Sequence, residues 1–162
     1  MAFSSRENTR SSRWRSASLP PVDADRAQIT DVLIRYATGI DSKDWPLFRT
    51  CWADEVDLDY GELGTFTDPD AFTDLFARVH DSMGNTYHRL SNFVIAIDEG
   101  GDTATARTYV HAVLMVAPGD NAPWVDVVGH YDDELTRGVN GWRIHRRVTC
   151  TPRMLTGGGS TS

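Results

Sequence analysis

The sequence predicts an α+β fold, in which helices pack on one face of a curved antiparallel sheet. Two observations predict it. Apolar residues recur with helical spacing over much of the first half of the chain and alternate with polar residues, as in strands, over the second half. The resulting order is helix, helix, strand, helix and a meander of long strands, without an internal repeat or linker. We therefore expect the 162 residues to hold one folded domain, over residues 21–152, between low-complexity tails at 1–20 and 153–162.

The first helix is predicted from about Asp23, a candidate N-cap, to Ile40. Its apolar residues lie at the spacing of one buried helix face, namely Ile29, Val32, Leu33, Tyr36, Ala37 and Ile40. Asp41 continues this face, because it lies four residues after Ala37. A carboxylate aimed at a core must be paired, neutralised or used in chemistry. The alternative is that Asp41 caps the short helix that follows it.

Three short elements are predicted next. Asp44 can cap a short second helix, with Pro46 in its first turn and Phe48 facing inward. The segment VDLDY, residues 56–60, alternates apolar and acidic residues and predicts a half-buried strand with Tyr60 on its apolar side. A third helix follows, with an N-cap and first turn at Asp68-Pro69 and an apolar face made of Phe72, Leu75, Phe76 and Val79.

The second half of the chain predicts an antiparallel meander. The strands are expected at residues 86–97, 103–117, 124–137 and 141–150, with hairpin turns at EGGD and GVNG. Alternation assigns their side chains to faces. Side chains expected to share a face are His88, Leu90, Asn92, Val94 and Ala96 in the first strand, Tyr109, His111, Val113 and Met115 in the second, and Gly129, Tyr131 and Asp133 in the third. The acidic groups Asp57/Asp59 and Asp132/Asp133/Glu134 are expected on solvated faces.

Charge and composition narrow the function classes. The net charge is −7, and residues 1–20 are basic, so the rest of the chain is more acidic than the total. This balance argues against nucleic acid or an anionic membrane as partner. The sequence has no apolar run of the roughly 20 residues that a membrane span needs, and it lacks the apolar region of a secretory signal. With two isolated cysteines, Cys51 and Cys150, we expect a cytoplasmic protein with free thiols.

Common catalytic motifs are missing from the sequence. It has no HExxH, HxH or paired-cysteine spacing, no GxGxxG after a strand, no phosphate-binding GxxxxGK[ST] and no GxSxG. We therefore expect no metal and no cofactor.

The remaining candidates for chemistry are Asp41, Tyr60, His88 and His111. If the helices cover the concave side of the sheet, these four side chains could converge in one pocket. Each also has a structural alternative, since both histidines could be satisfied within the fold and Tyr60 could serve in packing. His80, His130 and His145 are expected at the surface, without a role.

Several segments together resemble a known family. They are IDSKDW, VDLDY, TYHRLSN, DTATARTYVHA, GHYDDELTR and GWRIHRR. Over about residues 23–150 the chain resembles the SnoaL-like branch of the nuclear transport factor 2-like superfamily, most closely the scytalone dehydratase and lindane dehydrochlorinase types. The resemblance implies a cone, in which a strongly curved antiparallel sheet and about three N-terminal helices enclose a deep apolar pocket.

The resemblance also implies roles for the four candidates. His88 would be the general base, Asp41 would orient it, Tyr60 would hydrogen-bond the substrate carbonyl, and His111 would assist the leaving group. The chain departs from the dehydratase pattern at Ile40, where the dehydratase has a tyrosine. It also departs near Gly129 and Tyr131, where the dehydratase has small polar residues. We therefore expect a different substrate.

The resulting expectation is a cofactor-independent lyase acting on a small hydrophobic, aromatic or polyketide-like substrate. Candidates for the pocket wall are Tyr36, Phe48, Trp52, Phe72, Phe76, Tyr109, Met115, Trp124 and Tyr131. Two alternatives stay open: an isomerase or polyketide cyclase with the same Asp–His pair, and a non-catalytic ligand-binding or subunit module. The family also implies a homodimer or homotrimer, for which the outer face of the sheet is available.

Overall fold

The computed structural model describes residues 21–158, so the expected tail at residues 1–20 lies outside the described residues. The helices are α1 (Pro21–Asp41), α2 (Trp45–Arg49) and α3 (Pro69–Asp81), with a 3₁₀ turn at Gly61–Leu63. The strands are β1 (Trp52–Asp59), β2 (Thr65–Phe66), β3 (Thr86–Ile97), β4 (Thr103–Met115), β5 (Trp124–Gly138) and β6 (Gly141–Gly157). No helix within residues 21–158 is long and apolar enough to cross a membrane.

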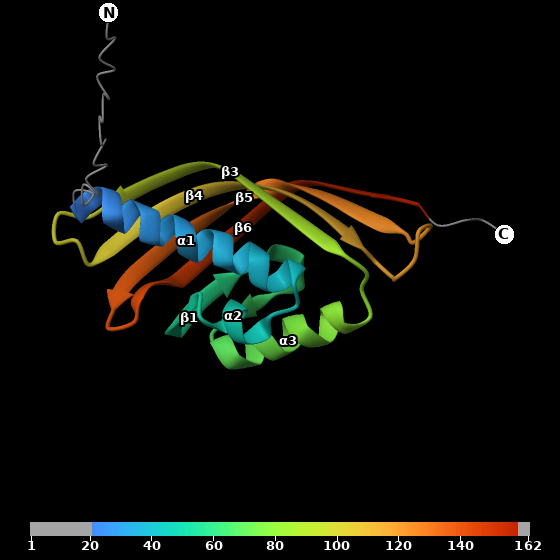
Figure 1. Cartoon of the computed structure of the whole chain (residues 1–162), viewed down its shortest axis with the longest axis horizontal. Coiled ribbons are helices and arrows are strands. Elements are labelled where there is room, and N and C mark those ends of the chain that lie inside the picture. The colour runs from blue at the N-terminus through green and yellow to red at the C-terminus, as the bar shows by residue number, and fades with distance from the viewer. Residues whose placement is uncertain (1–20, 159–162) are drawn as a thin grey trace, which may run out of the picture.

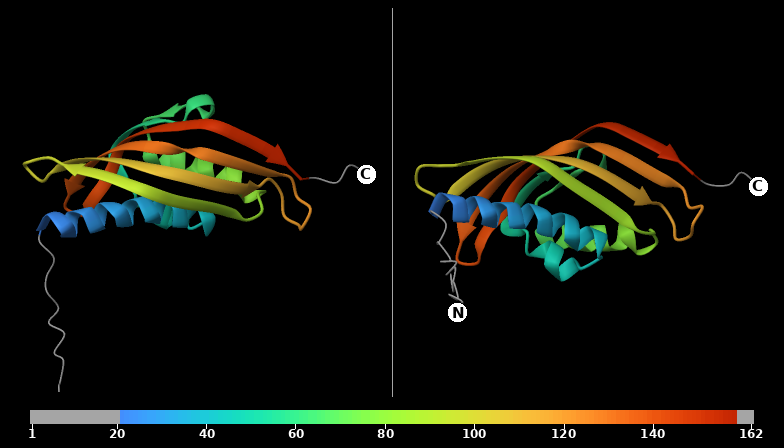
Figure 2. Two further views of the ribbon diagram at one scale, coloured as in Figure 1. Left: turned by 90° about the horizontal axis from the view of Figure 1, so that it is seen from above. Right: turned by 45° about the horizontal axis from the view of Figure 1, so that its top comes forward.

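The strands form one curved sheet in the order β2-β1-β6-β5-β4-β3. All neighbours are antiparallel except β1 and β6, which run parallel. The three helices lie on the same side of the sheet, with α1 running along it, and the opposite side is uncovered (Figures 1 and 2). The predicted α+β architecture, with three helices against one face of a curved sheet, is confirmed.

Helix α1 forms because its apolar stripe has a sheet to pack on. Ile29, Leu33 and Ile40 are at most 1% exposed. The helix begins at Pro21, so Asp23 lies in its first turn and is not the N-cap. A negative charge there still complements the positive end of the helix dipole. Asp44 does cap α2, since its Oδ1 accepts a hydrogen bond from the Leu47 N–H at 2.9 Å, and Asp68 caps α3 in the same way.

Aromatic side chains fill the space between the helices and the sheet. Phe48 of α2 is fully buried, and its ring centroid lies 5.4–5.8 Å from those of Trp52, Phe72 and Phe76. Tyr36 of α1 joins the same cluster. Such packed rings supply much of the apolar area that stabilises a small domain.

A buried ion pair lies beside this cluster. Arg147 on β6 donates two hydrogen bonds to the Asp133 carboxylate on β5, at 2.6 and 2.8 Å, and both side chains are fully buried. The guanidinium carbon lies 4.1 Å from the ring centroid of Tyr36 and 4.2 Å from that of Tyr131. The expectation that Asp133 faces solvent is therefore wrong. Alternation along β5 turns Asp133 toward the helices, while Asp132 faces outward.

A bulge in β3 changes the predicted assignment of faces. The β3–β4 register shifts between Ser91 and Val94, and Asn92 has a left-handed backbone with φ of 49°. The extra residue moves Ile95 inward and turns Val94 outward, where it is 64% exposed. The prediction that Val94 and Ala96 share a face with His88 is therefore wrong, although it holds for Leu90.

Strand β6 continues past the expected end of the domain at residue 152. Residues 153–157 pair with residues 124–128 of β5. The expected C-terminal tail from residue 153 therefore begins as part of the sheet, because β5 offers it a hydrogen-bonding partner.

Candidate active site

The site forms where the end of α1 meets the start of β3. Asp41 is the last residue of α1, and its carboxylate points at β3 rather than at α2. Oδ1 accepts hydrogen bonds from the Thr86 hydroxyl at 2.8 Å and from His88 Nδ1 at 2.7 Å. Oδ2 accepts one from the His88 backbone N–H at 2.8 Å. Asp41 is therefore paired with His88 and does not cap the following helix, where Asp44 takes that role.

The contact with Asp41 assigns the tautomer of His88. A carboxylate only accepts, so Nδ1 carries the hydrogen, and in the neutral ring Nε2 keeps a free lone pair. The His88 side chain is only 8% exposed. Within the described part of the chain, Nε2 forms no hydrogen bond. Asp41 thus holds one ring nitrogen of His88, and the other has no hydrogen-bond partner among the described residues.

A pocket of about 240 Å³ adjoins the pair. Besides Asp41 and His88 it is lined by Ile34, Ala37, Thr38, Leu90 and Phe93. Apart from the pair and the Thr38 hydroxyl these residues are apolar, so a substrate here would meet the imidazole in a weakly polar setting. Low polarity strengthens the electrostatic coupling between Asp41 and an imidazolium.

Two opposing effects set the pKa of Asp41. Burial acts to raise it, while the hydrogen bonds from the His88 side chain and backbone and from Thr86, together with the charge of His88, lower it. The second group prevails, and the pKa of Asp41 lies below its ordinary value of 3.8. Asp41 is thus an anion at neutral pH, as orientation of an imidazole requires.

The lowered pKa predicts how Asp41 affects acid stability. In the unfolded chain Asp41 has its ordinary pKa, so the unfolded state binds more protons in the acid range. The stabilisation by Asp41 is fully present above that ordinary value and is lost as the pH falls through the lowered folded pKa. We expect Asp41→Asn to have a lower free energy of unfolding than the wild type at pH 6. This difference in free energy should be smaller at pH 3, as measured by urea unfolding. A difference of constant size would contradict this account.

Tyr60 follows β1 and lies inside the aromatic cluster. Its hydroxyl is 3.1 Å from that of Tyr36, and its ring contacts Phe72 and Phe76. Burial raises the pKa of Tyr60 far above its ordinary value, although the nearby charge of Arg147 opposes this. Tyr60 is not among the residues that line the pocket at His88. It lies on the same side of the sheet as His88 but in the core.

The structure does not bring His111 to His88. Cross-strand pairing puts His111 beside Arg89, and His88 beside Ala112, so the two histidines point to opposite faces of the sheet. On the outer face His111 Nε2 lies 3.0 Å from Asp126 Oδ2. The predicted convergence of His111 with the other candidates is therefore wrong, because the sequence did not show which face of β4 meets the helices.

The expected wall residues divide between the two sides of the sheet. On the outer face, opposite His88, lie Tyr109, Met115 and Trp124. The others are buried on the helix side and pack in the core: Tyr36, Phe48, Trp52, Phe72, Phe76 and Tyr131. None of the nine lines the 240 Å³ pocket.

His80 is a buried histidine that sequence reasoning placed at the surface. It is 7% exposed, its ring stacks on Phe76 and packs against Trp45, and its Nδ1 donates to the Phe76 carbonyl at 2.8 Å. Burial lowers the pKa of His80, partly offset by that carbonyl, and the charges of His88 and Asp41 also act on it. The helical spacing indicates this burial, since His80 lies four residues after Phe76 on the apolar face of α3.

Comparison with known proteins decides the family. The model of the SnoaL-like domain matches residues 23–148. The chain belongs to the SnoaL-like domain family. Among relatives of this SnoaL-like protein, an uncharacterized protein of Mycobacterium tuberculosis is 29% identical over 137 residues, which cover 82% of this chain and 90% of that one.

Solved structures share the fold of this SnoaL-like domain. A protein of Kribbella flavida matches with a TM-score of 0.75 and 26% identity, over 83% of this chain and 95% of that one. A hexachlorocyclohexane dehydrochlorinase of Novosphingobium barchaimii matches with a TM-score of 0.73 and 18% identity, over 86% and 94%. A scytalone dehydratase-like protein of Novosphingobium aromaticivorans matches with a TM-score of 0.74 and 17% identity, over 86% and 91%. The expected resemblance to these types is confirmed at the level of fold.

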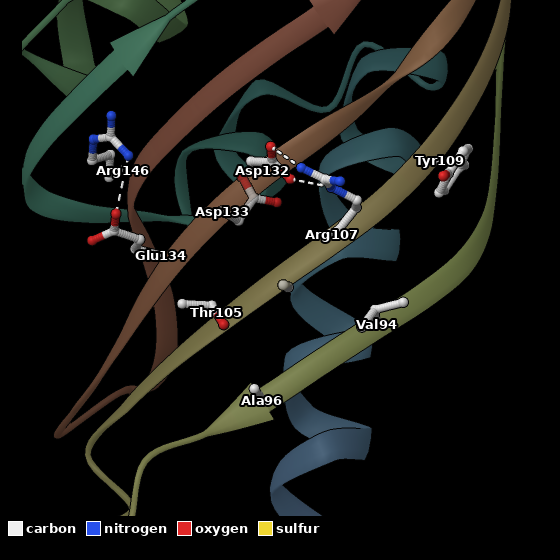
Figure 3. Close-up of a pocket in the computed structure, with 10 residues that line it drawn as sticks. Val94, Ala96, Thr105, Arg107, Tyr109, Asp132, Asp133, Glu134 and Arg146 are labelled. Atoms are coloured by element: carbon white, nitrogen blue, oxygen red, sulfur yellow. Dashed lines mark hydrogen bonds and ion pairs between the residues drawn. The ribbon is translucent and has the colours of Figure 1, made fainter.

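The SnoaL-like domain also has a larger hollow, of about 570 Å³, on the uncovered face of its sheet (Figure 3). Its charged side chains neutralise one another. Arg107 forms two hydrogen bonds of 2.6 Å to Asp132, and Arg146 forms one of 3.0 Å to Glu134. With its charges paired in this way, the hollow offers no reactive group comparable to His88. Residues 21–158 also contain no group of three His, Cys, Asp or Glu side chains that could hold a metal.

Proposed function

We propose that this SnoaL-like protein is a cofactor-independent lyase with His88 as general base and Asp41 as its orienting carboxylate. One observation carries the proposal: the 2.7 Å hydrogen bond between His88 Nδ1 and Asp41 Oδ1, at the wall of a small, mostly apolar pocket. A neutral imidazole with a free ring nitrogen is a suitable group for proton abstraction near neutral pH. That the fold also occurs in a dehydrochlorinase supports elimination as the reaction class.

The proposed reaction is an elimination. His88 Nε2 takes the proton from a carbon next to an electron-withdrawing group. The electron pair of that C–H bond becomes the new double bond, and the leaving group departs from the neighbouring carbon with the electrons of its own bond. When the leaving group is hydroxide, the proton held on Nε2 returns to it and water is released. Asp41 stabilises the imidazolium that exists between these steps.

The pocket indicates a small substrate. Its 240 Å³ is below the roughly 300–1,000 Å³ of sites for drug-sized ligands. The apolar side chains of Ile34, Leu90 and Phe93 suit a cyclic or polyketide-like skeleton, and the Thr38 hydroxyl offers one polar contact. We propose a compact β-hydroxy or β-halo carbonyl compound as the substrate class.

A direct test uses a panel of such compounds in deuterium oxide. We expect formation of the unsaturated product, detected by mass spectrometry, with the protein but not with the His88→Ala variant. Deuterium incorporation into unreacted or isomerised substrate, without loss of the leaving group, would instead show the isomerase or cyclase reading of the same Asp–His pair. If the protein binds compounds of the panel but catalyses neither loss of the leaving group nor deuterium exchange, a ligand-binding module would be favoured.

We also propose that the protein is a cytoplasmic homo-oligomer. Cys51 is a buried free thiol and Cys150 an exposed one, as a reducing compartment allows. The outer sheet face, with exposed Val94 and Tyr109, is the proposed surface for contact between copies. Light scattering of the purified protein tests this, since a monomeric mass at micromolar concentration would contradict it.

A further inference from the structure

Asp41 occupies a position that disfavours a carboxylate. It ends α1, where the helix dipole is negative, and the last turn of α1 has no basic residue. Its side chain is also mostly buried, with 26% exposed. Both conditions oppose the charged form, so the anion depends on the hydrogen bonds that it accepts.

Each of those hydrogen bonds comes from the first residues of β3. The Thr86 hydroxyl and His88 Nδ1 share Oδ1, and the His88 backbone N–H binds Oδ2. Thr86 is only 4% exposed, and it lies two residues before His88, so both side chains leave β3 on the same face. Within residues 21–158 the Thr86 hydroxyl has Asp41 as its hydrogen-bond partner.

We infer that Thr86 is a positioning residue, which acts on His88 through Asp41. Thr86 supplies the one of these three hydrogen bonds that does not come from His88, so its hydroxyl holds Oδ1 in place independently of the ring that Oδ1 orients. His88 Nδ1–H therefore meets an oxygen in a fixed place, and Nε2 is left without a hydrogen on a residue that lines the pocket. The part of this inference that concerns turnover rests on the proposed function, whereas the part that concerns the geometry of His88 does not.

The test compares three variants. Thr86→Val removes the hydroxyl but keeps the branched shape, Thr86→Ala removes it in a smaller side chain, and Thr86→Ser retains it as the matched control. Imidazole ¹⁵N–¹H correlation spectra report which ring nitrogen of His88 carries the hydrogen. We expect the wild type and Thr86→Ser to show the Nδ1–H form, and Thr86→Val and Thr86→Ala to show a mixture of both forms. The His88 amide should also exchange faster in the latter two.

Once a substrate that undergoes the elimination has been identified, its turnover can be compared among the variants. We expect Thr86→Val to lower kcat about tenfold with KM nearly unchanged, and Thr86→Ser to stay close to the wild type. An unaltered His88 tautomer in both Thr86→Val and Thr86→Ala would overturn the inference. If Thr86→Val does not fold, the comparison of the His88 tautomer in Thr86→Ala and Thr86→Ser decides whether the inference holds. Changed tautomers in a protein that lacks elimination activity would uphold the positioning role and reject the proposed function, so the two failures are distinguishable.

Discussion

His88→Ala is expected to lower turnover of an eliminated substrate by about 10² to 10⁴, the usual contribution of general acid–base catalysis. The loss should fall on kcat, because in the proposed mechanism His88 acts on the proton in the transition state while the apolar walls of the pocket still bind the substrate. Asp41→Ala should reduce turnover by a similar factor. The double variant should be little worse than either single variant, because the two residues act as one unit.

His130→Ala is the matched control for this prediction. His130 also has a nearby carboxylate, since its Nε2 lies 3.6 Å from Asp132 Oδ2, but it points to the outer face of the sheet. Its removal should leave turnover within about twofold of the wild type. Full activity in His88→Ala, or losses in the two single variants that multiply in the double, would contradict the role of the pair.

Asp133→Ala is expected to lower the free energy of unfolding by about 3–5 kcal/mol. The substitution leaves the guanidinium of Arg147 without its counter-ion in a fully buried position between the rings of Tyr36 and Tyr131. A buried charge without a partner is costly, and the rings offset only part of that cost. Urea unfolding measures the change.

The neighbouring residue supplies the control. Asp132 also forms two hydrogen bonds with an arginine, Arg107, but both side chains are 42–50% exposed. Asp132→Ala should therefore cost no more than about 1 kcal/mol, the usual range for an exposed ion pair. Equal losses in the two variants would show that burial does not decide the strength of these pairs.

The sequence was sufficient to predict the architecture, because its periodicity is strong. The stripe on α1, the alternation in β4 and β5 and the capping residues Asp44 and Asp68 all reflect local rules. Asp41 was found by the same reasoning, since a carboxylate on an apolar helix face conflicts with its surroundings. The pairing of Asp41 with His88, which came from the family resemblance, agrees with the 2.7 Å contact in the structure.

The predictions that the structure contradicts have a common physical cause. Alternation gives two faces to a strand but does not show which face meets the helices. The register puts His111 on the face opposite His88, which alternation alone does not reveal. A bulge adds a residue without changing composition, and only Asn92 hints at it. The local pattern around Asp133 predicts a solvated carboxylate, because its buried partner, Arg147, belongs to another strand. These are properties of long-range pairing, which a single sequence does not record.

Asp41 holds His88 with Nδ1 protonated and Nε2 free. The imidazole ¹⁵N–¹H correlation spectrum of the neutral His88 ring, recorded for the wild type and for Asp41→Asn, tests this arrangement. We predict the Nδ1–H form in the wild type and its loss, or a mixture of both forms, in the variant. A wild-type ring protonated on Nε2, or a spectrum indifferent to Asp41→Asn, would contradict the account.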